Sequence, residues 1–378
     1  MKSDVKIKDK AKRIIVLGMS PYRGGMETYI MNLYRAIIRY GYQFDFYLPH
    51  DCPELPFEDE IIRSGGKIYR LAYGKTENIF LHFINIFRVL KPIEIVGVYI
   101  NTCVLVDIDF LIVAKILKKP VRILHSHNGG YMSEMTRLNL ILEKKNKKQI
   151  SKYSTMLLAC SDIAGKWMFG EKSYYKIIHN GIEVEKYKFD FKIREKMRKK
   201  YQIENKKVIG VVGRIQYQKN PEFIVEIFEE LHKKDENTVL IWAGDGGGSD
   251  VEYIRHMIKQ KKLENHVKML GMVSNTNELY QMFDEFLLPS RFEGLPFVLI
   301  EAQCAGVRCW TSTEVSKEAN ITGNVYYISL EKSANEWADN MLVPNLINRS
   351  KYEEMIRSSG YSISDTAEEI VSILNKML

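Results

Sequence analysis

The sequence predicts an α/β protein with two domains, each built on a doubly wound parallel sheet. Short β-branched runs alternate with amphipathic segments along the chain, which is typical of strand–helix–strand units in a parallel sheet. The length of 378 residues fits two domains, since a domain holds roughly 150 residues. Charge also differs between the halves: residues 1–180 carry 28 Lys/Arg against 17 Asp/Glu, and the remainder carries 27 against 30.

The first series of elements occupies the amino-terminal half. Residues 13–18 predict a strand, and residues 28–40 predict a helix because apolar side chains such as Ile30, Leu33 and Ile37 recur at helical spacing. A turn signal at 179–181, followed by a charged helical stretch, places the domain boundary near residues 180–205. Further strands of this series are expected at 44–48, 96–100, 121–125 and 156–160.

The second series begins with a strand at 207–213 and continues with strands at 239–243, 267–270 and 285–289. Residues 364–378 predict a final helix, because Ile370, Ile373 and Leu374 form an apolar face that needs a packing partner.

Composition excludes several protein classes. Hydrophobic residues make up 46% of the chain and charged residues 27%, which excludes disordered, collagen-like and disulfide-scaffold proteins. The cysteines are odd in number and lack C-x-x-C spacing, so we expect a reducing, cytoplasmic compartment and no structural zinc. They are Cys52, Cys103, Cys160, Cys304 and Cys309.

Neither a membrane span nor a secretion signal is expected. The most apolar region, residues 93–116, is interrupted by charged side chains before it reaches the required length of about 18 residues. Residues 1–13 are polar and precede only a short apolar run, which is unlike a signal peptide or an anchor.

Positive charge is concentrated in residues 1–180, whose net charge is +11 while that of the remainder is −3. Such asymmetry indicates an anionic partner, either nucleic acid or phospholipid. No zinc-finger or RNP-type motif is present, so nucleic acid is not expected and a membrane surface is favoured. A solvated helix face is an equal alternative. The basic residues concerned are Arg137, Lys144, Lys145, Lys147, Lys148 and Lys152.

A candidate anion site lies in residues 289–302, where a strand is followed by a loop and a helix. Pro296 suits the first helical position, since an amide there would be unpaired anyway. The amides of Gly294 and Leu295 would then lie at a helix N-terminus, which suits a diphosphate. Glu293 and Glu301 border the site. Because a carboxylate would repel a bound phosphate, we expect these two side chains to face the hydroxyl groups of the ligand's sugars. The alternative is that Glu293 is a turn residue and Glu301 an exposed helix residue.

Two cations follow the strand that ends near Val212. Arg214 can hold two phosphate oxygens in a fork, and Lys219 supplies a point charge. Asn220 is expected as a helix cap and Pro221 as the first helical residue. Both cations would lie at the carboxyl end of a strand, where open α/β sheets bind ligands. Solvated surface charges are the alternative.

Two features of the first domain add to the site. Gly24 and Gly25 lie between the first strand and its helix, where glycine lets backbone approach a ligand closely. His125 and His127 share one face of a strand, which is a metal-binding pattern. No third ligand is near, so we reject the metal, interpret His125 as structural, and expect His127 to hydrogen-bond a ligand at the strand end.

Two other patterns are weaker. Asp107 and Asp109 form a D-x-D pattern that binds metal–nucleotide complexes elsewhere, but apolar flanks favour a helix edge. The glycine-rich run 244–248 lacks dinucleotide-binding spacing and is interpreted as a turn.

These motifs together resemble the retaining glycosyltransferases of family four, and among them the bacterial enzymes that build capsular or exported polysaccharide. The match includes the glycine pair, the strand-end histidine, Arg214 and Lys219, and two glutamates separated by seven residues. The pattern departs at Asn220, where glycine is usual, and at 307–310. The departure at 307–310 leaves acceptor binding or core packing there open.

The resemblance implies the GT-B fold, with two Rossmann-like domains facing across a cleft. Residues 1–185 would bind the acceptor, residues 186–361 would bind the nucleotide sugar, and the helix at 362–378 would pack back on the first domain.

The resemblance also implies the residue roles. Glu293 would hold the donor sugar and Glu301 the ribose, and Arg214 and Lys219 would bind the diphosphate. Gly25 would approach that phosphate from the other domain, and His127 would line the sugar pocket. Backbone near Val273 would read the base. The remaining donor-binding residues are Gly24, Gly294 and Leu295.

The implied reaction is metal-independent transfer of a hexose, with retention, from a UDP-hexose or UDP-N-acetylhexosamine to a glycan or polyprenyl-linked acceptor. The acceptor would attack the sugar on the same face from which the phosphate leaves. No cofactor is expected. Two alternatives remain open: a GT-B nucleotide-sugar epimerase, and a non-catalytic nucleotide-sugar-binding protein.

Overall fold

The computed structural model describes residues 11–22, 24–131, 134–246, 248–343 and 348–378. The chain divides into two compact units, Met1–Gly181 with Ile363–Leu378, and Ile182–Ser362. The expectation about a leader concerns residues 1–13, and residues 1–10 lie outside the described part. Within the described residues, no helix is both long and apolar enough to span a membrane.

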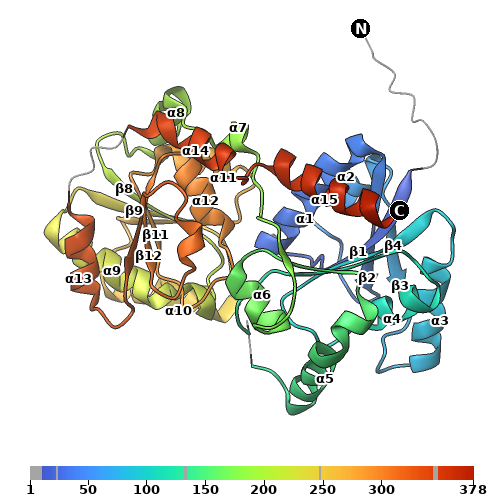
Figure 1. Cartoon of the computed structure of the whole chain (residues 1–378). Helices are drawn as coiled ribbons and strands as arrows, with labels where there is room; N and C mark the ends of the chain where they lie inside the picture. The colour runs from blue at the N-terminus through green and yellow to red at the C-terminus, as the bar shows by residue number, and fades with distance from the viewer. Residues whose placement is uncertain (1–10, 23, 132–133, 247, 344–347) are drawn as a thin grey trace, which may run out of the picture. The chain divides into compact units, whose positions relative to one another are not determined.

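The first unit contains a parallel sheet of seven strands in the order β3-β2-β1-β4-β5-β6-β7 (Figure 1). Its strands are β1 (Lys12–Leu17), β2 (Tyr42–Pro49), β3 (Ile68–Leu71), β4 (Ile95–Thr102), β5 (Val121–Ser126), β6 (Met156–Ala159) and β7 (Lys176–Ile177). Its helices are α1 (Gly25–Ile37), α2 (Glu58–Arg63), α3 (Ile79–Leu90), α4 (Asp109–Ile116), α5 (Arg137–Tyr153), α6 (Asp162–Phe169) and α15 (Ile363–Met377).

The second unit contains a parallel sheet of six strands in the order β10-β9-β8-β11-β12-β13. Its strands are β8 (Lys207–Val212), β9 (Thr238–Ala243), β10 (Val267–Gly271), β11 (Glu285–Leu288), β12 (Arg308–Ser312) and β13 (Val325–Ile328). Its helices are α7 (Val184–Tyr187), α8 (Phe191–Tyr201), α9 (Pro221–Lys234), α10 (Gly248–Gln260), α11 (Thr276–Met282), α12 (Phe297–Cys304), α13 (Ala334–Met341) and α14 (Tyr352–Ser358).

The two parallel sheets confirm the predicted α/β class. Central strands are buried on both faces, as β1 shows with Ile14, Ile15 and Val16 all at 0% exposure, because helices cover both sides of a doubly wound sheet. Strand order reverses between β1 and β4 in the first unit and between β8 and β11 in the second. Ligands of such sheets bind beyond the carboxyl ends of the strands at this reversal, so a ligand site is expected in the loops after these strands.

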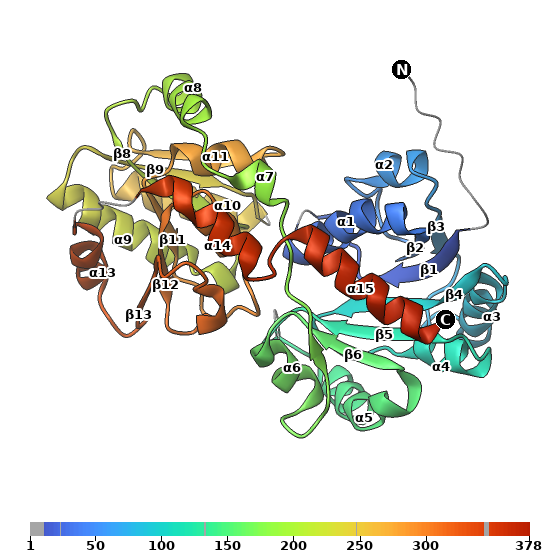
Figure 2. The ribbon, with the colours of Figure 1, turned by 45° about the horizontal axis from the view of Figure 1, so that its top comes forward.

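The carboxyl-terminal helix α15 belongs to the first unit, where it packs on α1 (Figure 2). Its apolar face is buried through residues that include Ile370 and Leu374. Tyr42 donates a hydrogen bond to Asn375 at 2.7 Å, and Thr366 donates one to the carbonyl of His179. The helix therefore supplies part of the core of the first unit, although about half of the chain separates it from the unit's other residues.

Candidate active site

Glu293 lies in the loop between β11 and α12 and is held by three side chains. Lys219 lies 2.5 Å from its Oε1, and Ser290 donates to the same oxygen at 2.8 Å. Gln218 donates to Oε2 at 3.2 Å. Glu293 is only 8% exposed, so this charge is buried with its partner rather than solvated. The carboxylate is thus fixed in orientation at the carboxyl end of β11.

Lys219 ends the short 3-10 helix η2 (Tyr217–Lys219) that follows β8. Its ion pair with Glu293 is a feature that the sequence pattern does not reveal, because the two residues are 74 positions apart. The next residue, Asn220, occupies the N-cap position of α9 as predicted, but its side chain makes no cap hydrogen bond, and its φ of 57° is left-handed. Asparagine tolerates that conformation better than most residues do. Pro221 is the first helical residue, as predicted.

Arg214 follows Gly213 at the carboxyl end of β8 and is half-buried. The backbone around it lies against the glycine-rich segment, since Ile215 donates to the carbonyl of Asp245. A side chain at Gly244 would place its Cβ 2.0 Å from the Gly213 carbonyl oxygen, and φ at Gly244 is +140°. The glycine run therefore lets the loops after β8 and β9 approach each other, and this packing positions Arg214.

Glu301 lies on α12 and is buried at 6% exposure. Tyr280 donates to its Oε2 at 2.7 Å, and Tyr187 is a second hydroxyl partner. Burial raises the pKa of Glu301 above its usual value, and the two tyrosines lower it in part. No lysine or arginine among the described residues pairs with this carboxyl group. Sequence reasoning missed both tyrosines, since nothing in their spacing links them to Glu301.

The loop before α12 is buried from Glu293 to Pro296. Pro296 corrects a prediction, because it occupies the N-cap position and the helix begins at Phe297. No side chain caps this helix, so the first-turn amides keep the polarity that attracts anions. Gly294 and Leu295 lie in this loop, and half-buried Val273 lies in the loop after β10, at the same end of the sheet.

In the first unit, Gly24 and Gly25 lie at the start of α1. Glu27 accepts hydrogen bonds from the Gly24 amide at 3.1 Å and from the Ser20 hydroxyl at 2.5 Å. The Thr28 hydroxyl donates to the Gly24 carbonyl. The glycine loop is thus held in place by a carboxylate of the helix that it precedes.

His127 follows β5, and its ring lies 4.1 Å from that of His125, so the two histidines share a face as predicted. His127 Nε2 lies 2.9 Å from Asn101 Oδ1. His125 is fully buried and its Nδ1 lies 2.8 Å from the Tyr99 hydroxyl. Burial lowers the pKa of His127 to about 3 and that of His125 well below its usual value. Both imidazoles are therefore neutral near pH 7.

Asp107 and Asp109 lie at the start of α4, as expected, where Asp107 accepts from the Asp109 amide at 2.7 Å. The structure adds His82, whose ligand atom lies within 4.8 Å of a carboxylate oxygen of each. The ammonium of Lys75 already lies 2.8 Å from Asp109. This ammonium pairs with one of the three groups that could ligate a metal ion.

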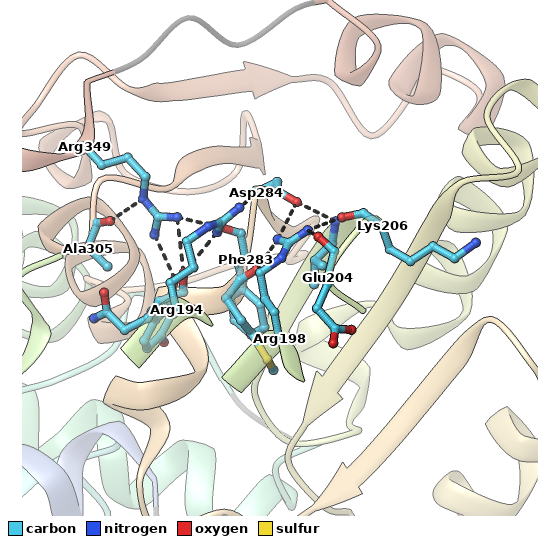
Figure 3. Close-up of polar contacts among 12 residues, drawn as sticks. Arg194, Arg198, Glu204, Lys206, Phe283, Asp284, Ala305 and Arg349 are labelled. Atoms are coloured by element: carbon cyan, nitrogen blue, oxygen red, sulfur yellow. Dashed lines mark hydrogen bonds and ion pairs between the residues drawn. The ribbon is translucent and has the colours of Figure 1, made fainter. Parts of the chain in front are cut away.

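A cavity of about 630 Å³ lies at the opposite end of the second sheet. Residues that open β8, β11 and β12 line it, so it faces the amino ends of the strands. Arg194 and Arg198 pair with Asp284, and Figure 3 shows the guanidinium of Arg349 beside this group. Arg349 donates to the carbonyls of Tyr280, Gln281, Phe283 and Ala305. These arginines hold the ends of α11 and α12, and no predicted site residue lines the cavity.

Residues 193–357 match the family model of Glycosyl transferases group 1. The second unit is a group 1 glycosyltransferase domain. This confirms the predicted resemblance, and the matched residues contain Arg214, Lys219, Glu293 and Glu301.

Several curated proteins are similar to this chain along nearly its whole length. EpsF of Bacillus subtilis, whose name describes it as a glycosyltransferase, is 27% identical over 380 residues, or 96% of each chain. The capsular polysaccharide biosynthesis glycosyltransferase CapH of Staphylococcus aureus is 26% identical over 93% of this chain and 95% of its own. The structure of Anabaena HepE in complex with UDP-glucose has a TM-score of 0.81 and 17% identity, and covers 96% of this chain and 99% of HepE. That likeness shows the GT-B fold.

Proposed function

We propose that this group 1 glycosyltransferase transfers a hexose, with retention, from a nucleoside diphosphate donor to a glycan or polyprenyl-linked glycan in surface polysaccharide biosynthesis. The observation that carries the proposal is the buried Lys219–Glu293 pair at the carboxyl end of the second sheet. A UDP-hexose or UDP-N-acetylhexosamine is the proposed donor. HepE with UDP-glucose and the capsular enzyme CapH support the donor and the pathway class.

Counting hydrogen bonds supports the proposed role of Glu293. A carboxylate offers about four acceptor positions, and Lys219, Ser290 and Gln218 occupy three. One position on Oε2 remains for a sugar hydroxyl. The three protein donors fix the orientation of the Glu293 carboxylate. No binding energy of the sugar would therefore be lost in ordering this side chain.

The diphosphate is proposed to lie against Arg214 and the amides of Gly294 and Leu295. When the bond between the anomeric carbon and the diphosphate breaks, its electron pair moves to the phosphate oxygen. Arg214, Lys219 and the first turn of α12 would stabilise the charge that develops there. The acceptor hydroxyl would form the new bond on the same face and pass its proton to the departing phosphate, so the step balances without a metal.

The remaining contacts follow the same proposal. Glu301 would accept hydrogen bonds from the ribose, backbone at Val273 would contact the base, and Gly24 and Gly25 would approach the phosphate. His127 would bind a hydroxyl of the sugar. Glu301 suits two vicinal hydroxyls because its present partners, Tyr187 and Tyr280, are hydroxyl donors too.

Peripheral contact with an anionic membrane at the cytoplasmic face is part of the proposal. On α5, Leu138 and Ile141 are each 65% exposed. Five of the six predicted basic residues are exposed, and they lie on the same helix as these apolar side chains. Lys147 is the exception, because its ammonium lies 4.3 Å from the centre of the Trp167 ring. A basic helix with exposed apolar side chains suits an anionic bilayer surface.

The test combines donor binding with transfer. Melting temperature is measured with UDP, GDP and ADP and with their sugars, in the presence of EDTA. We expect one base family to raise the melting temperature of the wild type and of Lys233→Ala, an exposed control on α9, and to lose this effect in Arg214→Ala. Glu293→Gln should keep nucleotide binding and lose most of the transfer activity. A requirement for a divalent ion would contradict the metal-independent reaction, and epimerised donor without acceptor would identify an epimerase.

A further inference from the structure

Asn101 lies between two groups that it contacts with different ends of its amide. It lies on β4, directly after Ile100, which pairs with Leu17 of β1. Its Nδ2 donates to the Leu17 carbonyl at 3.2 Å, and its Oδ1 lies 2.9 Å from His127 Nε2. The close approach of β1 and β4 requires Gly18, since a Cβ there would lie 2.3 Å from the Asn101 carbonyl oxygen.

The Leu17 contact determines which way the amide faces. A carbonyl oxygen only accepts hydrogen bonds, so the amide end beside Leu17 must be the NH₂ group. The reverse orientation would place two acceptor oxygens 3.2 Å apart. Asn101 therefore presents Oδ1, which only accepts, to His127.

The orientation of the Asn101 amide also determines the tautomer of His127. Since Asn101 Oδ1 accepts, His127 Nε2 must carry the proton and donate it. A neutral imidazole carries one ring proton, so Nδ1 is then a bare acceptor. This Nδ1 is screened from solvent and has no hydrogen-bond partner among the described residues. Burial keeps the ring neutral, as its lowered pKa shows.

His125 provides the contrast. Its Nδ1 contacts the hydroxyl of Tyr99, which in turn contacts the hydroxyl of Tyr29 at 2.8 Å. A hydroxyl both donates and accepts, so this chain of contacts is compatible with either tautomer of His125. The two rings lie side by side, but only His127 has a partner that accepts without donating.

We propose that Asn101 is a positioning residue that holds His127 as the Nε2–H tautomer, so that Nδ1 accepts a hydrogen bond from the ligand. The ligand group at His127 must then be a donor, such as a sugar hydroxyl or an acetamido N–H. Ionised phosphate and carboxylate oxygens are excluded as partners of His127 Nδ1, because they carry no proton to donate to its lone pair. The assignment of that ligand to a donor sugar rests on the proposed function, whereas the tautomer does not.

The test reads the tautomer in the full-length protein without nucleotide. The protein is labelled with ¹⁵N-histidine, and long-range ¹H–¹⁵N correlations distinguish a protonated from an unprotonated ring nitrogen. His127→Gln assigns the His127 signals by their loss. We expect wild-type His127 to show a protonated Nε2 and an unprotonated Nδ1 from pH 6 to pH 8. Asn101→Leu, of similar size, should shift this single species to a mixture.

Tyr99→Phe is the matched control, since it removes the hydroxyl beside His125 and should leave the His127 tautomer unchanged. A wild-type His127 with a protonated Nδ1 would overturn the proposal, as would an unaltered tautomer in Asn101→Leu. The wild-type spectrum decides the question even where the leucine variant does not fold. The tautomer is measured without nucleotide, whereas the transferase proposal is tested by donor binding and transfer. Failure of one proposal can therefore be distinguished from failure of the other.

Discussion

The ammonium of Lys219 lies 2.5 Å from Glu293 Oε1, and the two side chains are 15% and 8% exposed. They come from η2 after β8 and from the loop after β11, strands that neighbour each other at the reversal of strand order. The pair therefore joins the two loops that frame the proposed donor site. Each residue serves both the stability of these loops and the chemistry proposed for them.

Removing one partner of this pair should destabilise the second unit. Lys219→Met leaves the Glu293 carboxylate buried with only neutral donors, which costs about 3 kcal/mol. Chemical denaturation of Lys219→Met, Glu293→Gln and the double variant measures the coupling. We expect the double variant to lose less stability than the sum of the single losses, and strict additivity would show that the pair does not interact.

Glu293→Gln should also impair transfer by about 100-fold in kcat, since the amide would reverse one hydrogen bond of an oriented acceptor. The KM for the donor should change less, because the diphosphate contacts remain. Glu222→Gln, at the start of α9, is the control for loss of a carboxylate in the same unit. Equal kcat in both variants would remove Glu293 from the reaction.

Donor affinity should fall at acidic pH through Glu301. Burial raises the pKa of this carboxyl group, so protonation begins at a higher pH than for an ordinary glutamate, and a protonated carboxyl accepts fewer hydrogen bonds from a ribose. Calorimetric titration with UDP between pH 5 and pH 8 measures the decline. Tyr280→Phe removes a hydroxyl that stabilises the carboxylate, so the decline should move to higher pH.

In Glu301→Gln the acidic decline should disappear, because the amide does not titrate. Folding stability should behave in the opposite sense to donor binding. A carboxyl group whose pKa is higher in the folded state binds protons more tightly there, so its contribution to stability falls as pH rises through that pKa. If Tyr280→Phe leaves the pH profile of UDP binding unchanged, Glu301 does not contact the ligand.

Arg349 should be needed for stability and not for donor binding. It donates to four backbone carbonyls at the ends of α11 and α12, and each buried carbonyl left unpaired costs about 1 kcal/mol or more. We expect Arg349→Met to lose at least about 2 kcal/mol of unfolding free energy. Arg255→Met on α10, 60% exposed, should lose under about 0.5 kcal/mol. A large loss of UDP affinity in folded Arg349→Met would contradict this separation.

Membrane contact through α5 should depend on both charge and apolar side chains. Each basic residue near an anionic surface contributes about 1 kcal/mol, so Lys144→Glu with Lys148→Glu should release the protein from vesicles of phosphatidylglycerol and phosphatidylcholine. Ile141→Ser should weaken the binding that remains at high salt. Lys172→Glu with Lys176→Glu is a matched charge control elsewhere in the unit. Absence of wild-type binding at low salt would remove the membrane from the proposal.

Local patterns were sufficient to predict the parallel α/β class and nine of the strands in the described residues, but β3, β7, β12 and β13 were not predicted. Arg214, Glu293 and Val273 follow strands, and strand ends can be located from β-branched runs and the polar residues that interrupt them. The start of α12 was less accurate, since Pro296 lies at the N-cap and the helix begins at Phe297, because backbone angles there depend on the neighbouring loops.

Side-chain partners were decided only by the tertiary structure. The sequence places Lys219 and Glu293 after different strands, but their contact depends on β8 and β11 being neighbours. The tyrosine beside Glu301 and the asparagine beside His127 likewise come from separate elements. Apolar periodicity is a property of consecutive residues and so is present in the sequence. Which polar atoms meet depends on strand order and register, which arise only when distant segments pack together.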